Sequence, residues 1–357
     1  MTLFELRELG TIMEPLPGNP LEAEGVLNPA AARGPDGALY LFPRLVAARN
    51  YSRIGIAKVI FNQAGDPVGV ERLGIALQPQ EPYELRSPRT GGCEDPRVTF
   101  MGSLQRYVMT YVALSRAGPR VAMAISADLM NWRRMGLTDF EPYHGIDFED
   151  IDDKDATLFP DPLVDPSGGL KFALLHRPHF TGKGPGDTGS MTMSRAADLD
   201  RKSIWISYSD VKETVAEPSD LGTFNSHLPL ASPEAQWDHI KIGAGTPPIL
   251  TRHGWLLIYH GVTKRAASHG ALNEFRYSAG LMILDKVDPR IVIYRSAEPL
   301  FTLGQSDETT GSKSDVVFPT GIDRRDDLGM PDRFDIYYGM GDTRIGAVTL
   351  TLPEALS

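Results

Sequence analysis

The sequence predicts an all-β fold, a five-bladed β-propeller, from three observations. A short β-like pattern recurs five times along the chain, glycine and proline interrupt it throughout, and no long stretch has a convincing helical period. There are 35 glycines and 28 prolines among 357 residues. Turn residues at this density favour many short strands over long helices.

The recurring pattern opens with an aromatic or large apolar residue, continues with apolar residues, and reaches a polar group about four residues later. The copies begin at residues 40, 107, 172, 256 and 334, a spacing of about 65 to 85 residues that fits a four-stranded blade with long loops. A second β-like run follows each copy, at residues 52–59, 120–126, 190–194, 277–284 and 343–350.

The repeat brings distant residues together. In a propeller the innermost strands surround a central channel, so residues at matching places in the repeat face one funnel. The residues that this argument brings together are Arg44, Tyr111, Arg177, His260 and, further along its own repeat, Asp342. We therefore expect one catalytic domain over residues 1–357, with about residues 1–25 as an N-terminal extension.

Composition excludes several classes of partner. Lysine and arginine number 36 against 46 acidic residues, and a net charge of -10 argues against nucleic acid or an anionic membrane. The first residues lack the basic start and apolar run of a signal peptide, and no segment approaches membrane-spanning length. Cys93 is the only cysteine, so no intrachain disulfide is possible and a cytoplasmic location is expected.

An acidic motif supplies the candidate proton donor. Residues 91–97 read GGCEDPR, with Glu94 and Asp95 adjacent. Because Pro96 disfavours the helical region for the residue before it, we expect Asp95 to leave an extended backbone with a fixed aim, as a catalytic acid requires. By itself the motif has a simpler interpretation, a turn in which Arg97 neutralises the aspartate.

Three cationic or potentially cationic residues complete the candidate site. Arg177 lies in LHRP, Lys241 opens KIGAGTPP, and His260 follows the strand-like WLLIY. Singly, Arg177 could pair with Asp155, Lys241 could be an exposed strand end, and His260 could be a core histidine. Together they suit a phosphate dianion, which prefers an arginine fork, a lysine charge and a further donor. The sequence thus predicts an anion site beside a proton donor.

These residues carry a resemblance that extends from Asn28 to Asp342. The sequence resembles glycoside hydrolase family 130, the inverting β-mannoside phosphorylases and their hydrolytic relatives, which are built on a five-bladed propeller. The matching runs are residues 92–97, 154–160, 176–178, 241–248, 259–261 and 337–342.

The resemblance implies a role for each matched residue. Asp95 matches the general acid, and Asp342 matches an acid that holds hydroxyls of the mannose being cleaved. The residues that match phosphate ligands are Arg177, Lys241 and His260; those in runs that line the sugar site are Asn28, Arg44 and Arg97; Tyr111 is added from the repeat. Some relatives have Arg-Asn where this chain has Lys154-Asp155, two further substrate-binding candidates, so a contact of Lys154 with phosphate stays open.

The implied reaction is attack of inorganic phosphate on a β-D-mannoside, with inversion, to give α-D-mannose 1-phosphate and an acceptor sugar. The mannoside is a mannosyl-glucose, a mannosyl-N-acetylglucosamine or a manno-oligosaccharide. Asp95 supplies the proton, in this family through a mannose hydroxyl. Phosphate is already a competent nucleophile, so neither a second carboxylate nor a metal or organic cofactor is required.

Two alternatives stay open. A β-mannosidase of the same fold would use water and need a second carboxylate, for which Glu94, Glu274 and Glu308 are available. A non-catalytic sugar-binding propeller is the other, because a fold does not imply catalysis. The sequence leaves the linkage (β-1,4 or β-1,2), the acceptor and a possible homo-oligomer undetermined.

Overall fold

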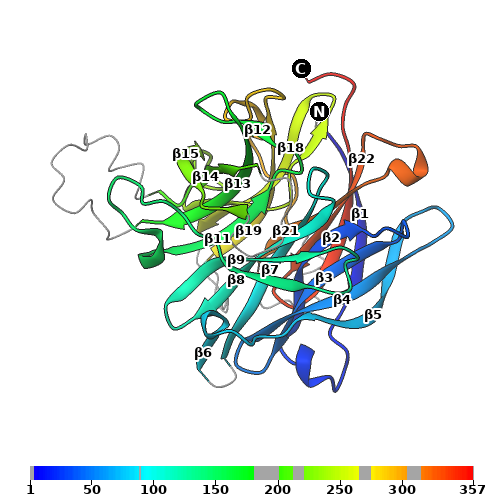
Figure 1. Ribbon diagram of the computed structural model, residues 1–357. Helices are drawn as coiled ribbons and strands as arrows, with labels where there is room; N and C mark the ends of the chain where they lie inside the picture. The colour runs from blue at the N-terminus through cyan, green and yellow to red at the C-terminus, as the bar shows by residue number, and fades with distance from the viewer. Residues whose placement is uncertain are drawn as a thin grey trace.

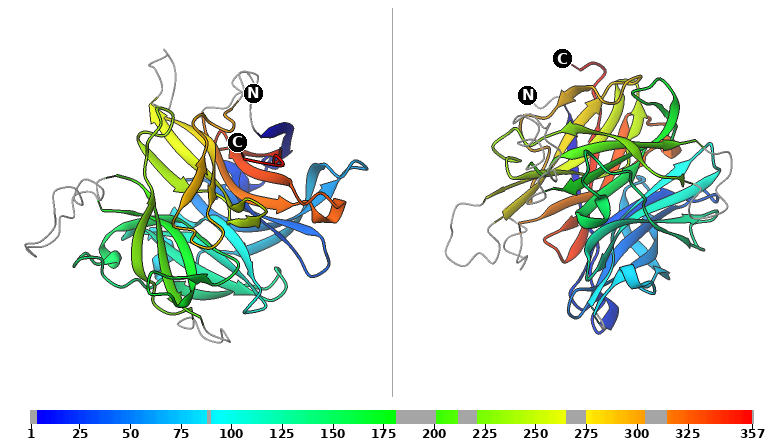
Figure 2. Two further views of the ribbon diagram at one scale, coloured as in Figure 1. Left: turned by 90° about the horizontal axis from the view of Figure 1, so that it is seen from above. Right: turned by 60° about the vertical axis from the view of Figure 1, so that its left-hand side comes forward.

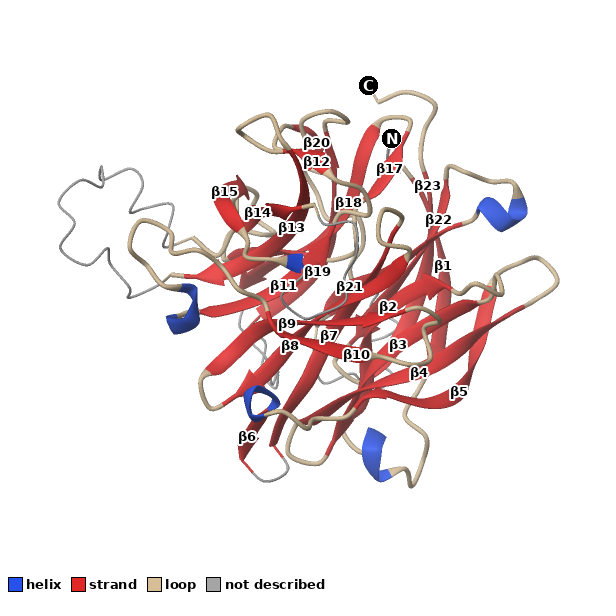
Figure 3. Cartoon of the chain, viewed as in Figure 1, coloured by secondary structure: helices blue, strands red, loops and turns tan. Residues whose placement is uncertain are grey.

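The computed structural model describes residues 4–87, 90–180, 201–211, 221–264, 275–303 and 315–356. These residues form antiparallel strands gathered into four sheets, and the described helices are short 3-10 turns (Figures 1 and 3). The 3-10 turns are η1 (Pro20–Glu22), η2 (Pro82–Glu84), η3 (Phe148–Asp150) and η5 (Asp326–Leu328). The predicted all-β class is therefore confirmed. Within the described residues, no helix is long and apolar enough to cross a membrane.

The largest sheet has nine strands and consists of two antiparallel meanders. Only a short parallel pairing, of Tyr51 and Ser52 with Gly91 and Gly92, joins the two meanders. The first meander contains β2 (Gly25–Arg33), β3 (Leu39–Ala47), β4 (Tyr51–Phe61) and β5 (Pro67–Leu77). The second contains β7 (Thr90–Met101), β8 (Arg106–Ser115), β9 (Gly118–Ser126) and β10 (Arg133–Leu137), with β6 (Leu85–Ser87) beside β7.

The three remaining sheets repeat the four-stranded antiparallel order. One contains β11 (Asp152–Leu158), β13 (Leu170–His179), β14 (Ile204–Asp210) and β15 (Asn225–Ala231), with β12 (Leu163–Val164) beside β13. The next contains β16 (Lys241–Ala244), β18 (Gly254–Lys264), β19 (Phe275–Leu284) and β20 (Val292–Arg295), with β17 (Ile249–Thr251) beside β18. The last contains β21 (Val317–Arg324), β22 (Arg333–Met340), β23 (Arg344–Thr351) and β1 (Glu5–Met13).

The start of the chain is part of this last sheet and not an extension of the fold. Strand β1 pairs along its length with β23, from Glu5 opposite Thr351 to Met13 opposite Ile345. In Figure 2 the blue and red ends of the ribbon accordingly lie together. The expected extension over residues 1–25 is corrected to a strand followed by the 3-10 turn η1.

The five predicted repeats are real strands, but they are the second strand of each unit. They correspond to β3, β8, β13, β18 and β22, which pair with β2, β7, β11, β16 and β21 respectively. These preceding strands are harder to detect in the sequence because four of them, β2, β7, β11 and β21, carry a register shift. Of the second β-like runs, residues 190–194 lie outside the described residues.

Two cavities lie at opposite ends of the strands that precede the repeats. A cavity of about 480 Å³ is lined near the strand ends by Ala31, Val98, Pro160, Pro247 and Ile322. A second cavity, of about 230 Å³, is lined near the strand starts by Asn28, Asp95, Asp155, Lys241 and Phe318. The strands β2, β7, β11, β16 and β21 therefore run in one direction between the two cavities.

The hydrophobic core lies between neighbouring sheets. Val108 and Met123 of the nine-stranded sheet pack in one cluster with Leu158, Phe172 and Leu174 of the next sheet, and all five are buried. Alternation along each strand directs every second side chain to one face, so adjacent sheets share these clusters. The packed sheets hold the strands around both cavities.

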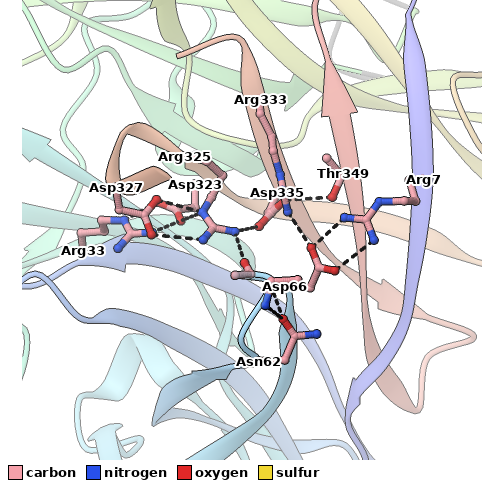
Figure 4. Close-up of polar contacts among 12 residues, drawn as sticks. Arg7, Arg33, Asn62, Asp66, Asp323, Arg325, Asp327, Arg333, Asp335 and Thr349 are labelled. Atoms are coloured by element: carbon pink, nitrogen blue, oxygen red, sulfur yellow. Dashed lines mark hydrogen bonds and ion pairs between the residues drawn. The ribbon is translucent and has the colours of Figure 1, made fainter. Parts of the chain in front are cut away.

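An ion-pair network joins the last sheet to the first meander, as Figure 4 shows. Arg325 is 1 % exposed, and its Nη1 donates to Asp335 at 2.5 Å and to the Gly65 carbonyl at 2.6 Å. Asp66 accepts from Arg7 at 2.7 Å and from Arg333 at 2.8 Å, contacts that lower the pKa of Asp66 to about 2. The network thus connects β1 and β22 to the turn between β4 and β5.

Candidate active site

The 230 Å³ cavity contains most of the charged residues predicted for the site. Its lining comprises Leu27, Asn28, Arg44, Asp95, Lys154, Asp155, Arg177, Lys241, Phe275, Tyr277, Val316, Phe318 and Asp342. A larger cavity of about 610 Å³ lies elsewhere, between the second meander and the segment around Phe148. The smaller cavity is the candidate active site because carboxylates and cations from several sheets converge in it.

Three of the lining residues occupy irregular positions of their strands. Asn28, Asp95 and Asp155 have positive φ angles of 47°, 48° and 58°. Each lies at a shift in strand register, in β2, β7 and β11 respectively. A bulge of this kind breaks the alternation of side chains and re-aims one of them. The predicted extended backbone at Asp95 is therefore wrong, since the bulge overrides the preference imposed by Pro96.

Asp95 and Glu94 share one arginine. Asp95 Oδ1 accepts from Asn28 Nδ2 at 2.8 Å and from Arg44 Nη1 at 3.0 Å, while Arg44 Nη2 donates to Glu94 Oε1 at 2.7 Å. Burial opposes ionisation of Asp95, but the charges of Arg44 and Arg97 and these hydrogen bonds hold its pKa below the ordinary value. Burial raises the pKa of Glu94, and the charge of Asp95 raises it further. The charge of Arg44 lowers it, but the net shift is upward.

Arg97 lies behind the cavity wall and is not among the residues that line the cavity, contrary to expectation. It is 1 % exposed, and Nε and Nη2 donate to the carbonyls of Gly245 and Ala244, both at 3.0 Å. Nη1 donates to the Asp95 carbonyl at 2.9 Å. Arg97 therefore fixes the bulge around Asp95 to the end of β16, and it does not neutralise the Asp95 carboxylate through a hydrogen bond.

Asp155 is the buried centre of the cationic residues. Its Oδ2 accepts from Arg177 Nε at 2.6 Å, and its Oδ1 lies 3.5 Å from Arg97 Nη2. Burial opposes the charge of Asp155, but Arg177, His260 and Arg97 hold the pKa of this carboxyl far below its usual range. A side chain on Gly243 would place a Cβ 2.2 Å from Asp155 Oδ2, so a glycine is required there. The pairing with Asp155 orients Arg177 at the cavity wall.

His260 also lies one layer behind the cavity. It is fully buried, with Nε2 3.5 Å from Asp155 Oδ2 and its ring 4.4 Å from that of Phe318. Neither ring nitrogen has a hydrogen-bond partner. Burial lowers the pKa of His260 to about 3, so the imidazole is neutral at physiological pH. His260 therefore lies near the other two predicted phosphate ligands, Arg177 and Lys241, but it does not line the cavity.

Lys241 carries a charge that titrates near neutral pH. Its Nζ donates to the Tyr277 hydroxyl at 2.7 Å, and burial, followed by the charge of Arg177, lowers its pKa to about 8. Lys241 is therefore an ammonium below pH 8 and loses its charge above it. Binding of a phosphate dianion favours the charged form.

We expect the phosphate dissociation constant to rise above pH 8, by up to about tenfold per pH unit, because the ammonium must be restored before the anion binds. In Lys241→Arg the charge persists throughout this range, so the profile should be flat between pH 8 and 9.5. Calorimetric titration with phosphate measures both. A flat profile in the unmodified protein would contradict the role of Lys241.

Tyr111 is not in the cavity. It is 2 % exposed, packs in the core cluster of the nine-stranded sheet, and donates from its hydroxyl to Glu84 Oε1 at 2.7 Å. By strand register Tyr111 lies opposite the bulge of β7, as His176 lies opposite the bulge of β11, so it is one residue out of step with Arg177. The prediction that Tyr111 joins the other candidates in the cavity is corrected accordingly.

Comparison with known proteins identifies a family for this chain. A family model for glycoside hydrolase family 130, described as beta-1,4-mannooligosaccharide phosphorylase, matches residues 15–357. The chain belongs to glycoside hydrolase family 130.

Family 130 relatives match over most of the chain. A 1,2-beta-oligomannan phosphorylase from Thermoanaerobacter sp. is 28% identical over 350 residues, 96% of this chain and 95% of that protein. A beta-1,4-mannooligosaccharide phosphorylase from Ruminococcus albus is 34% identical over 262 residues, and the match spans 73% of this chain and 63% of the relative. The fold resembles a beta-1,2-mannobiose phosphorylase from Listeria innocua, with a TM-score of 0.69 at 23% identity, covering 99% and 97% of the two chains.

Sequence reasoning missed several residues in and beside the cavity. Tyr277, Phe275 and Phe318 line it, although only Tyr277 had a signal, as the first residue of the run at 277–284. Beside the cavity, Asn50 and Ser52 both contact Arg44 and Glu94. Ser52 had a signal as the first residue of the run at 52–59, and Asn50 had none. The alternative acids Glu274 and Glu308 lie outside the described residues.

Proposed function

We propose that this chain catalyses the inverting phosphorolysis of a β-D-mannoside to α-D-mannose 1-phosphate and an acceptor sugar. The observation that carries the proposal is the convergence of Asp95 with Lys154, Arg177 and Lys241 in one small cavity. The names of the two sequence relatives, a 1,2-beta-oligomannan phosphorylase and a beta-1,4-mannooligosaccharide phosphorylase, support the same reaction.

In the proposed mechanism, phosphate binds at Arg177 and Lys241 and attacks C1 of the mannose ring from the face opposite the leaving sugar. The C1–O bond of the leaving sugar breaks, and a new C1–O bond forms to phosphate. The proton from Asp95 passes through a mannose hydroxyl to the departing oxygen. Asn28 and Arg44, which donate to Asp95 Oδ1, stabilise the carboxylate that remains.

Asp95 must hold a proton when the reaction begins. Its pKa in the ligand-free protein is lowered by Arg44 and Arg97, which favours the carboxylate. A phosphate dianion in the cavity opposes the field of these arginines, so its binding raises the pKa of Asp95. Phosphate binding and proton uptake by Asp95 are thus coupled in the proposed cycle.

The geometry disfavours hydrolysis with Glu94 as base. An inverting hydrolase places its two carboxyl groups about 6.5–9.5 Å apart on opposite faces of the sugar ring. Glu94 and Asp95 instead bind the same Arg44 guanidinium, and Glu94 accepts further contacts from Asn50 and Ser52. Of the two other acids that line the cavity, Asp155 is engaged by Arg177, and Asp342 matches the residue expected to hold mannose hydroxyls.

The reaction should depend on inorganic phosphate. Incubation with β-1,2- and β-1,4-mannobiose is expected to yield mannose 1-phosphate only when phosphate is present, since phosphate is the nucleophile. Chromatographic separation of mannose from mannose 1-phosphate measures the outcome. Equal release of free mannose with and without phosphate would establish a mannosidase, and no turnover of any mannoside would favour a sugar-binding propeller.

The finer description of the fold is also a proposal. We infer one domain, a five-bladed β-propeller, in which the two meanders of the nine-stranded sheet are separate blades. The short parallel bridge between them and the two cavities at opposite ends of β2, β7, β11, β16 and β21 support this arrangement. The channel between the cavities would be the propeller axis.

The remaining features of the proposal follow from the chemistry. Phosphate supplies the nucleophile and Asp95 the proton, so neither a metal nor an organic cofactor is required. A cytoplasmic location and a possible homo-oligomer stay predictions. A screen of acceptor sugars with mannose 1-phosphate as donor, followed by released phosphate, would identify the acceptor and the linkage.

A further inference from the structure

A third lysine lies beside the two that line the cavity. Lys202 forms an isolated parallel bridge with Lys241, in which the Ile242 amide donates to the Lys202 carbonyl at 3.0 Å. Residues paired in this way direct their side chains to the same side. Lys202 therefore faces the side on which Lys241 faces the cavity, but it is not itself a cavity residue. It adds a third lysine to this side of the cavity.

The register between β11 and β13 adds a histidine to the same surface. Lys154 pairs with Arg177, and two residues away Asp152 pairs with His179. Because side chains alternate along a strand, His179 shares the face of Arg177. His179 Nε2 is buried without a hydrogen-bond partner, and burial, then the charge of Lys202, lower the pKa of the ring.

The lysines of this surface have no ion-pair partner among the described residues. Asp155 is committed to Arg177, and Asp152 lies 3.4 Å from Arg120. Among the ion pairs of the described ranges, none includes Lys154, Lys202 or Lys241. Burial, followed by the charges of Arg177 and Lys154, lowers the pKa of Lys202, so the folded protein disfavours this ammonium. A bound anion would stabilise it.

We propose that Lys202, together with Lys154, forms an outer anion-binding site, here called the outer step. A phosphate group would bind there on its way between solvent and the inner residues Arg177 and Lys241. That the ligand is phosphate rests on the proposed function, whereas the outer step itself is inferred from the positions and charges of the lysines. A row of like charges leading into a partly desolvated cavity raises the association rate of an anion. The phosphate group could be free phosphate or that of the sugar phosphate product.

The test compares Lys202→Gln and Lys202→Glu with the same changes at Lys286, an exposed lysine in the turn after β19. We expect kcat/KM for phosphate to fall about threefold in Lys202→Gln and about tenfold in Lys202→Glu, with the difference decreasing at high salt. The kcat/KM for the mannoside at saturating phosphate should change little. Both Lys286 variants should match the unmodified protein.

Measuring the reaction in both directions distinguishes the two sources of the phosphate group, inorganic phosphate and mannose 1-phosphate. A loss confined to inorganic phosphate assigns the step to the free anion, and a loss confined to mannose 1-phosphate in the synthetic direction assigns it to the product. Equal values for the Lys202 and Lys286 variants in both directions would overturn the proposal.

Calorimetry with inorganic phosphate alone separates this inference from the proposed function. A protein that binds phosphate yet releases free mannose equally well without it would contradict phosphorolysis only. Weaker phosphate binding by Lys202→Glu than by Lys286→Glu would then still support the outer step, and equal binding would overturn it.

Discussion

Replacing Asp95 by Asn should lower kcat for phosphorolysis of a natural mannobiose by about 10²–10⁴-fold, the range typical for loss of a general acid. Asparagine tolerates the left-handed backbone found at this position, where φ is 48°, and its carbonyl can still accept from Asn28 and Arg44. The substitution therefore removes the proton and leaves the local structure. Steady-state kinetics at saturating phosphate measure the effect.

An activated substrate provides the control for this prediction. A dinitrophenyl β-mannoside has a leaving group that needs no protonation, so the Asn variant should lose less than about tenfold on it. Glu94→Gln serves as the comparison, because Glu94 contacts the same arginine. Its activity on the two substrates should change in parallel. An equal loss on both substrates for Asp95→Asn would contradict the acid role, and a selective loss for Glu94→Gln would transfer that role to Glu94.

Replacing Asp155 by Asn should lower the free energy of unfolding by about 3–5 kcal/mol, because two buried arginines lose their carboxylate. Asp155 is fully buried against Arg177 and Arg97, and asparagine can keep its φ of 58°. Phosphate should restore part of the loss, since the anion offers Arg177 a new partner. Chemical denaturation with and without phosphate measures both effects.

Asp210→Asn is the matched control for Asp155. Asp210 pairs with Lys171, and its side chain is 73% exposed, so its loss should cost less than about 1 kcal/mol. Phosphate should stabilise this variant no more than the unmodified protein. If Asp155→Asn were as stable as Asp210→Asn, Asp155 would not be the centre that holds the cationic residues.

The sequence predicted the chemistry of the site better than its geometry. Asp95, Arg177 and Lys241 were found from residue types that suit a proton donor and an anion, and all three line one cavity. Arg97 and His260 were expected there too, but both are buried behind it. Whether a side chain lines the cavity or is buried behind it depends on how the sheets pack, and a local sequence pattern does not contain that information.

Register explains the other differences. The repeat marked the second strand of each unit, because strands such as β8 and β18 are nearly continuous buried runs that pair with β9 and β19 without a register shift. The preceding strands β2, β7, β11 and β21 each carry such a shift. A displacement of one residue moves a side chain to the opposite face of a sheet. For this reason Tyr111 faces the core, since it lies opposite the bulge of β7, one residue out of step with the place that Arg177 has in β13. The bulges at Asn28, Asp95 and Asp155 required long-range pairing to identify.

The pairing of β1 with β23 has a consequence for synthesis on the ribosome. Translation makes β1 long before the strand that it pairs with, since Glu5 lies opposite Thr351. At about 5–20 residues per second this interval is on the order of half a minute. During that time β1 has an open edge, and Arg7 and Asp66 lack the third member of their network, Arg333. Nascent chains stalled before β22 should therefore be the form most prone to chaperone capture.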